Sequence, residues 1–169
     1  DPQALSALDA SRSRVEAMGR IHQQLYQNED WARVDFDEFL GELVEDLFET
    51  YRLGAVELDL DSEPVYCDVD QAIHCCLLIN ELVTNALKHA FPDGGPGRVR
   101  VGMKMLPDGQ VMLEVADDGV GFPAGLDFRR TDSLGLQIVV SLVKNLAGQI
   151  DMASAGGTTF KVVFPPLSS

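Results

Sequence analysis

The chain has 169 residues, of which 46% are hydrophobic and 24% charged, and its formal net charge is −14 at pH 7. This length fits one ordinary domain, with room for an appendage, and allows a sizeable core. The acidic balance argues against non-specific nucleic-acid binding, and no apolar run approaches the roughly 20 residues of a membrane span. We therefore expect a globular chain that contacts neither nucleic acid nor membrane.

The start of the chain and its cysteines indicate a reducing compartment. The first ten residues lack the basic region and the apolar core of a signal peptide. Cys67, Cys75 and Cys76 show no metal-ligand spacing, and adjacent side chains on a helix point in different directions. We interpret them as small buried thiols, and we expect a cytoplasmic location.

Residues 2–28 are predicted to form a helix. Mostly small or apolar side chains recur there at alternating steps of four and three residues, and we call them the seam: Ala4, Leu8, Ser11, Val15, Met18, His22 and Leu25. This spacing suits a helix packed lengthwise against others. The helix would be exposed on an isolated monomer, so we expect it to dock on the domain or to pair between chains. On this seam His22 is expected to be packed and hydrogen-bonded rather than phosphorylated.

A polar segment at residues 29–34, interrupted by Trp31, divides the chain into regions 1–29 and 30–169. A second amphipathic helix follows, in which Asp35 and Glu38 form a capping signal and Gly54 ends the helix. Its apolar side chains share one face: Phe36, Phe39, Leu40, Leu43, Val44, Leu47, Phe48 and Tyr51. The opposite face is acidic, which indicates a solvated surface.

The remaining pattern alternates strands and helices. Residues 55–60 alternate as a strand with Val56, Leu58 and Leu60 inward, and 65–67 are a second short strand. Asp68 or Asp70 caps a long helix that runs to about residue 90. Two strands at 98–105 and 110–115 follow, then a helix beginning near Gly135, then a strand pair at 149–153 and 158–164. Three to four helices against five or six strands imply a two-layer α/β sandwich of the α+β kind.

The long helix carries polar side chains of three kinds in a row. In the segment NELVTNALKHAF at residues 80–91, Glu81, Asn85 and Lys88 fall within a narrow arc, while apolar side chains occupy the opposite face. An ordinary solvated face is the alternative interpretation. Asn80 points away from the three.

A glycine-rich turn follows the strand at 111–115 and reads DDGVG at residues 117–121. Gly119 and Gly121 permit positive φ and a close backbone approach. Asp117 is either a turn-forming residue or a hydrogen-bond acceptor held at the end of a strand. Because no second strand follows within hairpin distance, the second interpretation is favoured.

Four motifs in this order resemble the ATP-binding domain of sensor histidine kinases, within the wider GHKL ATPase group. Residues 80–91 resemble its N box, 117–121 its first glycine box, 134–136 its second, and 156–160 its last corner. Residues 7–27 resemble the end of the dimerisation helices of the second HisKA type, related to the HWE kinases. The resemblance implies a Bergerat-type sandwich, with a mixed sheet and a nucleotide between helices on one side.

The resemblance assigns roles to the N box. Asn85 is the expected ligand of Mg²⁺, an ion that prefers oxygen ligands and keeps several waters. Glu81 is expected to orient a metal-bound water or to accept the proton of the nucleophile. Lys88 is expected to contact phosphate oxygens, and His89 is a secondary candidate for ATP contact.

Further roles are implied after the first glycine box. Asp117 is expected to accept a hydrogen bond from the adenine amine, with Gly119 and Gly121 beside the base. Gly135 and Leu136 begin a helix whose free N–H groups suit phosphates. Thr158 or Thr159 is expected to contact adenine through water.

Residues 122–133 form the expected mobile lid, in which Arg129 and Arg130 either contact phosphates or are simply solvated. The family often has Asn where this chain has Asp118, a change that adds negative charge near the metal.

The sequence therefore predicts a catalytic domain that binds Mg–ATP in a sensor histidine kinase. Its γ-phosphoryl acceptor would be a histidine in an upstream helical segment, and the expected partners are that segment, a response regulator and a second protomer. Because the phosphoacceptor box is missing from the chain, self-phosphorylation by this chain alone is not expected. The alternatives are another GHKL ATPase or protein-serine kinase, and a non-catalytic ATP sensor.

Overall fold

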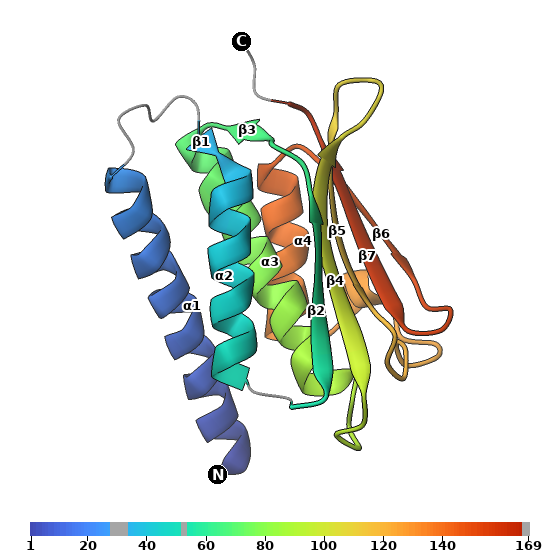
Figure 1. Cartoon of the computed structure of the whole chain (residues 1–169). Coiled ribbons are helices and arrows are strands. Elements are labelled where there is room, and N and C mark those ends of the chain that lie inside the picture. The colour runs from blue at the N-terminus through green and yellow to red at the C-terminus, as the bar shows by residue number, and fades with distance from the viewer. Residues whose placement is uncertain (28–33, 52–53, 167–169) are drawn as a thin grey trace.

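A computed structural model of the chain describes residues 1–27, 34–51 and 54–166. It has two layers, with a twisted sheet on one side and helices on the other (Figure 1). Within these ranges the α-helices are α1 (Pro2–Tyr26), α2 (Phe36–Tyr51), α3 (Val69–His89) and α4 (Leu134–Asn145), and a single 3₁₀ turn, η1, spans Phe128–Arg130. The expected α+β sandwich is confirmed.

The main sheet has five strands in the order β2-β4-β5-β7-β6. These strands are β2 (Val56–Ser62), β4 (Gly97–Met105), β5 (Val111–Asp117), β6 (Gln149–Ala153) and β7 (Thr158–Phe164). β2 pairs with β4 in parallel and the other pairs are antiparallel, so the sheet is mixed as expected. A second, two-stranded sheet joins β1 (Val34–Asp35) to β3 (Tyr66–Cys67), and β1 was not expected from the sequence.

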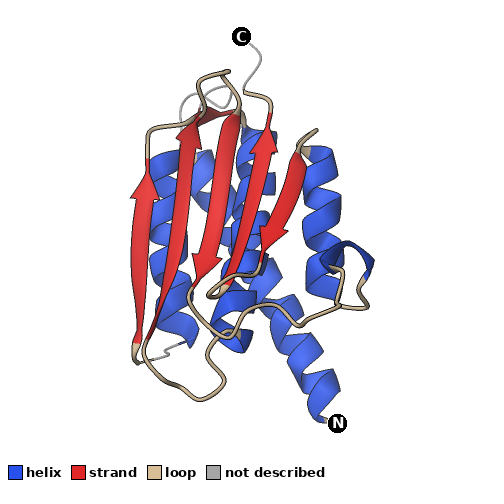
Figure 2. Cartoon of the chain, turned by 90° about the vertical axis from the view of Figure 1, so that its right-hand side faces the viewer, coloured by secondary structure: helices blue, strands red, loops and turns tan. Residues whose placement is uncertain are grey.

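The helices cover one face of the main sheet and leave the other open (Figure 2). Alternate side chains of the central strands point into the core, as Val111, Leu113 and Val115 of β5 do. The edge strand β2 departs from the predicted alternation. Leu60 was expected to face inward but is 36% exposed, because β2 has a neighbour on one side only.

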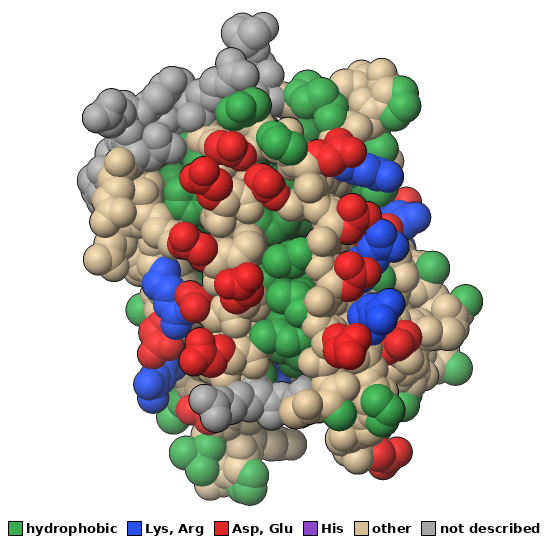
Figure 3. Space-filling view, viewed as in Figure 1, with side chains coloured by type: hydrophobic (Ala, Val, Ile, Leu, Met, Phe, Trp, Pro, Cys, Tyr) green, Lys and Arg blue, Asp and Glu red, His purple; other side chains and the backbone are tan. Residues whose placement is uncertain are grey.

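Helix α2 begins at the predicted position and has the predicted core face, and its predicted end before Gly54 borders residues outside the described ranges. The carboxylate of Asp35 accepts a hydrogen bond from the backbone N–H of Asp37 (3.2 Å), which satisfies a free donor at the start of the helix. Acidic side chains gather along the outer side of α2, consistent with the solvated face expected there (Figure 3).

Helix α3 is the centre of the helical layer. Asp68, and not Asp70, is its N-cap, and Asp68 and Gln71 form a reciprocal capping box. The sequence predicted one apolar face and one polar face, but the five consecutive residues 80–84 are all buried. The reason is that α1, α2 and α4 surround α3 on the sides that the sheet leaves free.

Helix α1 docks on α3 with a face that shares only Leu25 with the predicted seam among its buried residues. Ala17, Ile21 and Leu25 are buried, whereas Leu8 and Val15 are 65% and 69% exposed. Docking on the domain is thus confirmed, but most of the seam is left on the outer side of the helix, and His22 is exposed on it rather than packed. The N-terminal turns of α1 extend past the edge of the sheet (Figure 2).

The cysteines and the absence of a membrane span can be compared with the described structure, whereas the predicted boundary cannot. The three cysteines are free and buried as expected, and burial raises the pKa of the Cys76 thiol. In the described ranges no helix combines the length and the apolar character that crossing a bilayer requires. The predicted boundary at residues 29 and 30, with Trp31 beside it, lies outside the described residues.

Candidate functional site

A cavity of about 410 Å³ opens between α3, α4 and the ends of β5 and β7. The loop from Val120 to Ser133 forms its outer wall. The polar side chains on its wall come from four separate parts of the chain: Asn85, His89, Asp117, Thr131, Ser133 and Thr158. The remaining wall is mostly apolar, with Leu82, Phe122, Leu136 and Phe160 among its residues. A flat apolar ligand with a polar edge fits such a surface.

At one end of the cavity, the Asp117 carboxylate is held at the end of β5. Its Oδ1 accepts hydrogen bonds from the backbone N–H groups of Gly119 (3.0 Å) and Thr158 (3.3 Å). Burial raises the pKa of Asp117 above its ordinary value, these two N–H groups oppose the shift, and the negative charge of Asp118 adds to it. The result is a fixed acceptor oriented toward the cavity.

Two glycines allow the backbone to close around Asp117. A Cβ on Gly119 would lie 2.2 Å from the carbonyl oxygen of Ala90, which also accepts a hydrogen bond from the N–H of Val120 (2.9 Å). Gly157 has a φ of +126°, and a Cβ there would lie 1.9 Å from the carbonyl oxygen of Asp117. The turn after β5 therefore needs glycine at position 119, and the turn between β6 and β7 needs glycine at position 157.

Asp118 and Thr159 lie apart from the cavity. Asp118 accepts a hydrogen bond from the backbone N–H of Arg98 at Oδ1 (2.7 Å), so its charge is directed toward β4 rather than toward the cavity. Of the two predicted threonines, Thr158 lines the cavity and Thr159 does not, because successive side chains of a strand point to opposite faces.

At the other end of the cavity, α3 meets the start of α4. Ser133 caps α4, and its Oγ accepts a long hydrogen bond from the N–H of Leu136 (3.5 Å). A Cβ on Gly135 would lie 3.0 Å from Oε2 of Glu81 and 3.8 Å from Oδ1 of Asn85. Two side chains of the predicted N-box trio thus come together with a helix N-terminus, whose first N–H groups have no intrahelical acceptor.

Lys88, the third side chain of the trio, lies elsewhere. It is exposed, and its ammonium lies 5.4 Å from the centroid of the Tyr51 ring, a cation–π contact with α2. His89 is also exposed but lines the cavity. The role predicted for Lys88 therefore stays a prediction without a contact at the cavity.

Sequence reasoning missed Arg14 of α1. Its guanidinium forms a two-pronged ion pair with Glu81, in which Nε donates to Oε1 and Nη2 donates to Oε2, the latter at 3.2 Å. The two side chains are only 18% and 6% exposed. No local signal links residues that are 67 positions apart, and Arg14 lies between residues of the predicted seam, which suggested a different packing face.

The predicted lid contains the short turn η1. Phe128 is buried against Phe160, and Arg129 donates to the carbonyl oxygen of Ile150 (2.6 Å) while its guanidinium carbon lies 4.4 Å from the Phe128 ring centroid. Arg129 therefore fastens the loop to β6. Arg130 is exposed and does not line the cavity.

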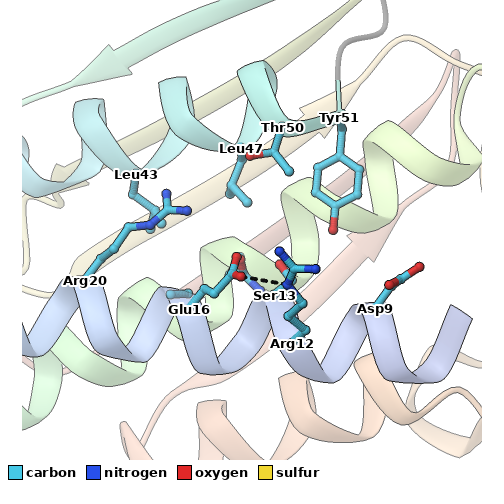
Figure 4. A pocket seen from close by; sticks show the side chains of 11 residues that line it. Asp9, Arg12, Ser13, Glu16, Arg20, Leu43, Leu47, Thr50 and Tyr51 are labelled. Atoms are coloured by element: carbon cyan, nitrogen blue, oxygen red, sulfur yellow. Dashed lines mark hydrogen bonds and ion pairs between the residues drawn. The ribbon is translucent and has the colours of Figure 1, made fainter. Parts of the chain in front are cut away.

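A second cavity, of about 320 Å³, lies between α1 and α2 and reaches α3 at Asn80 (Figure 4). Arg12 and Glu16 on its rim pair with each other, and Tyr51 lies across from them. Asn80 lines this second cavity, with an exposed fraction of 2% and no hydrogen-bond partner for its Oδ1 among the described residues. Asn80 thus points away from the larger cavity, as the helical spacing indicated.

The larger cavity is compatible with a magnesium ion held mainly by its ligand. Among the described residues there is no cluster of three or more His, Cys, Asp or Glu side chains able to hold a metal. The candidate donor on the cavity wall is the neutral oxygen of Asn85, because both oxygens of Glu81 are engaged by Arg14. One or two oxygen donors are what Mg²⁺ needs when phosphates and waters complete its octahedron.

Comparison with known sequences identifies two matching families. Residues 70–168 match the family described as histidine kinase-, DNA gyrase B-, and HSP90-like ATPase, and residues 1–51 match a histidine kinase family, HisKA_2. Blue-light-activated histidine kinase 2 of Erythrobacter litoralis is 30% identical over 96% of this chain and 48% of its own length. Sensor histidine kinase PdtaS of Mycobacterium tuberculosis is 31% identical over 88% of this chain and 30% of its own length.

A solved structure is similar over nearly the whole chain. The histidine kinase domain of the Erythrobacter litoralis EL346 blue-light-activated kinase superposes with a TM-score of 0.86 and 27% identity, covering 93% of this chain and 75% of the solved one. This chain spans about half or less of the length of the curated relatives that it matches.

Proposed function

The chain belongs to the histidine kinase-, DNA gyrase B- and HSP90-like ATPase family and contains its ATP-binding domain, and from this premise we propose that it is the catalytic domain of a sensor histidine kinase. In this proposal Mg–ATP occupies the larger cavity. The γ-phosphoryl group is then transferred to a histidine of an upstream helical segment and from there to an aspartate of a response regulator.

The observation that carries the proposal is the contrast between the two ends of one cavity. The adenine amine would donate to the fixed carboxylate of Asp117, with Gly121 on the cavity wall near the base, while Gly119 allows the turn to pack closely on Ala90. Thr158 supports the Asp117 carboxylate through its backbone N–H and is the better placed threonine for a water-mediated contact with the base. The triphosphate extends toward Asn85, Gly135 and Leu136, where a helix N-terminus favours an anion.

Asn85 and the phosphates would hold Mg²⁺, which supplies neutralising charge to the triphosphate. The side chains of this chain then contribute position and electrostatics rather than covalent chemistry. In this proposal Glu81, one turn from Asn85, would orient a metal-bound water while its ion pair with Arg14 stays in place. His89 contributes a polar side chain at the cavity wall.

The two regions of the chain have separate parts in this proposal. Residues 1–29 are the end of a dimerisation region, and residues 30–169 are the catalytic domain of a cytoplasmic signalling protein. The outer side of α1, which carries exposed Leu8 and Val15, is the surface for the upstream phosphoacceptor helices in a homodimeric kinase.

The experiment has two steps. Calorimetry of the chain with Mg–ATP tests binding, and incubation with labelled ATP and a separately produced phosphoacceptor segment tests transfer. We expect binding, labelling of the segment, and little phosphate release without it. Steady phosphate release without an acceptor would indicate a hydrolytic ATPase instead, and binding without transfer would indicate an ATP sensor.

A further inference from the structure

The wall of the proposed nucleotide site carries too little positive charge, among the described residues, for a triphosphate. A triphosphate with several negative charges must enter a chain whose net charge is −14, so cations are needed where the phosphates lie. Among the described residues, no Lys or Arg lines the larger cavity. His89 is the one basic side chain on its wall in that part of the chain.

The other described cations are engaged elsewhere or exposed. Lys88 lies over Tyr51, and Arg129 is hydrogen-bonded to the backbone of β6. Ion pairs with acidic neighbours hold Arg12, Arg20, Arg98, Arg100 and Lys161. The N-terminal amides of α4 supply only partial charge.

Arg14 is also ion-paired and does not line the cavity, but its position differs from that of the other cations. Its Nη2 lies 3.8 Å from the position that a Cβ on Gly135 would take, and Oδ1 of Asn85 lies at the same distance from that position. The guanidinium of Arg14 therefore lies beside the first turn of α4, on the same side of Gly135 as the proposed metal ligand. It is also partly shielded from solvent, with 18% of its side chain exposed, so its charge is less screened than that of a surface arginine.

The ion pair with Glu81 leaves part of the guanidinium available. An arginine has five N–H groups, and two of them, on Nε and Nη2, engage Glu81. Within the described ranges, Glu81 is the acceptor that the Arg14 side chain is seen to bind. The remaining three N–H groups can donate to phosphate oxygens while Glu81 fixes the orientation of the planar group.

We propose that Arg14 of α1 is a phosphate-binding residue of the nucleotide site, oriented by Glu81 and acting on the terminal phosphates of ATP. This inference rests on the proposed function and extends it. It makes the site a composite, because α1 contributes the cation while α3 and α4 contribute the amide oxygen and the helix N-terminus. Terminal phosphates would then stabilise the docking of α1 on α3, whereas AMP would not.

The test must distinguish a loss of phosphate binding from the loss of the Arg14–Glu81 ion pair. Replacing Arg14 alone leaves Glu81 as a buried charge without its partner, which by itself is destabilising. The informative comparison is between Glu81→Gln and the double variant Arg14→Met/Glu81→Gln, because neither contains an unpaired carboxylate at this position. Arg12→Met is the matched control, since Arg12 is on the same helix and pairs with Glu16 on that helix.

Calorimetry with Mg–ATP and with AMP measures the effect. We expect Glu81→Gln to bind Mg–ATP at least as tightly as the wild type, since a negative charge is removed. We expect the double variant to bind Mg–ATP about tenfold or more weakly than Glu81→Gln, the scale of a lost charge-assisted hydrogen bond, with AMP affinity changed less than twofold. Arg12→Met should bind both ligands like the wild type.

Three results would overturn the inference. Equal Mg–ATP affinity of Glu81→Gln and the double variant would show that Arg14 serves only the ion pair. Parallel losses for ATP and AMP would show a general structural effect. A wild-type chain that binds no Mg–ATP would refute the proposed function together with this inference, whereas the first two results leave the proposed function intact.

Discussion

The two ends of the cavity are built in different ways. The Asp117 end comes from short segments whose backbone atoms hold the functional group, with N–H donors from Gly119 and Thr158. The opposite end brings together three helices, with side chains of Asn85 and Glu81 on α3 and Arg14 on α1, and the first turn of α4. The Asp117 end is therefore held by backbone contacts, and the opposite end depends on how α1 docks.

The largest expected effect is at the helical end. Asn85→Ala should lower the affinity for Mg–ATP by about a hundredfold or more, because the variant loses the proposed metal ligand and the ion bridges the phosphates. Calorimetry with and without Mg²⁺ measures the loss. Asn145→Ala, at an exposed position at the end of α4, is the control and should bind normally. An unchanged affinity for Asn85→Ala would remove this residue from the site.

The next largest effect is expected at the Asp117 end of the cavity. Asp117→Asn should weaken ATP binding by about tenfold to a hundredfold, the scale of a hydrogen bond to a charged group, while inorganic triphosphate binds as before. Asp118→Asn is the matched control, since the Asp118 carboxylate accepts from Arg98 on β4. Equal losses for ATP and triphosphate would contradict an adenine-specific role.

Gly119→Ala tests the packing that supports Asp117. The added methyl group would meet backbone atoms of Ala90, and overpacking of this kind costs about 1–3 kcal/mol of unfolding free energy. Thermal denaturation measures it. Gly95→Ala is the control, because a Cβ at Gly95 meets nothing within 4 Å. A Gly119→Ala protein as stable as the wild type would refute the close approach.

A smaller effect is expected in the pH dependence of ATP binding. Burial raises the pKa of Asp117, so as the pH falls this carboxylate takes up a proton at a higher pH than an ordinary aspartate and loses its acceptor character. Affinity should therefore decline on acidification earlier than an unperturbed carboxylate predicts. Asp118→Asn should move the decline to lower pH, because the Asp118 charge contributes to the raised pKa. A decline that is identical in Asp117→Asn would assign it to another group.

The smallest effect is expected for Lys88→Ala. Because the ammonium of Lys88 contacts the Tyr51 ring, we expect Mg–ATP affinity to fall by no more than about twofold, in line with an exposed charge screened by solvent. Calorimetry under the same conditions as for the Arg14 variants compares the loss of Mg–ATP affinity in Lys88→Ala with the loss in the Arg14 double variant. A tenfold loss would restore Lys88 to the site and weaken the case for Arg14.

Sequence patterns predicted what depends on neighbours in the chain. Local signals account for the start of α2, the bounds of β6 and β7, the cap of α3 by an aspartate, and the position of Asp117 at a strand end. Helical spacing also brought Glu81 and Asn85 together correctly. These features depend on periodicities and caps that a single segment carries.

The features that the sequence did not predict depend on tertiary packing. Helix α1 carries two stripes that share Leu25, and the mostly exposed one looked like the better packing face than the one with Ala17 and Ile21. The Arg14–Glu81 pair follows from that choice of face. Lys88 shares an arc with Asn85, but the ring of Tyr51 on a neighbouring helix determines where its ammonium lies.

The most direct test of the account is a crystal structure with Mg²⁺ and a non-hydrolysable ATP analogue. We predict that the exocyclic amine of adenine lies within hydrogen-bond distance of the Asp117 carboxylate, and that the triphosphate and metal lie beside Asn85 and the first turn of α4. A nucleotide bound in the cavity between α1 and α2, or one with its base turned away from Asp117, would contradict the account.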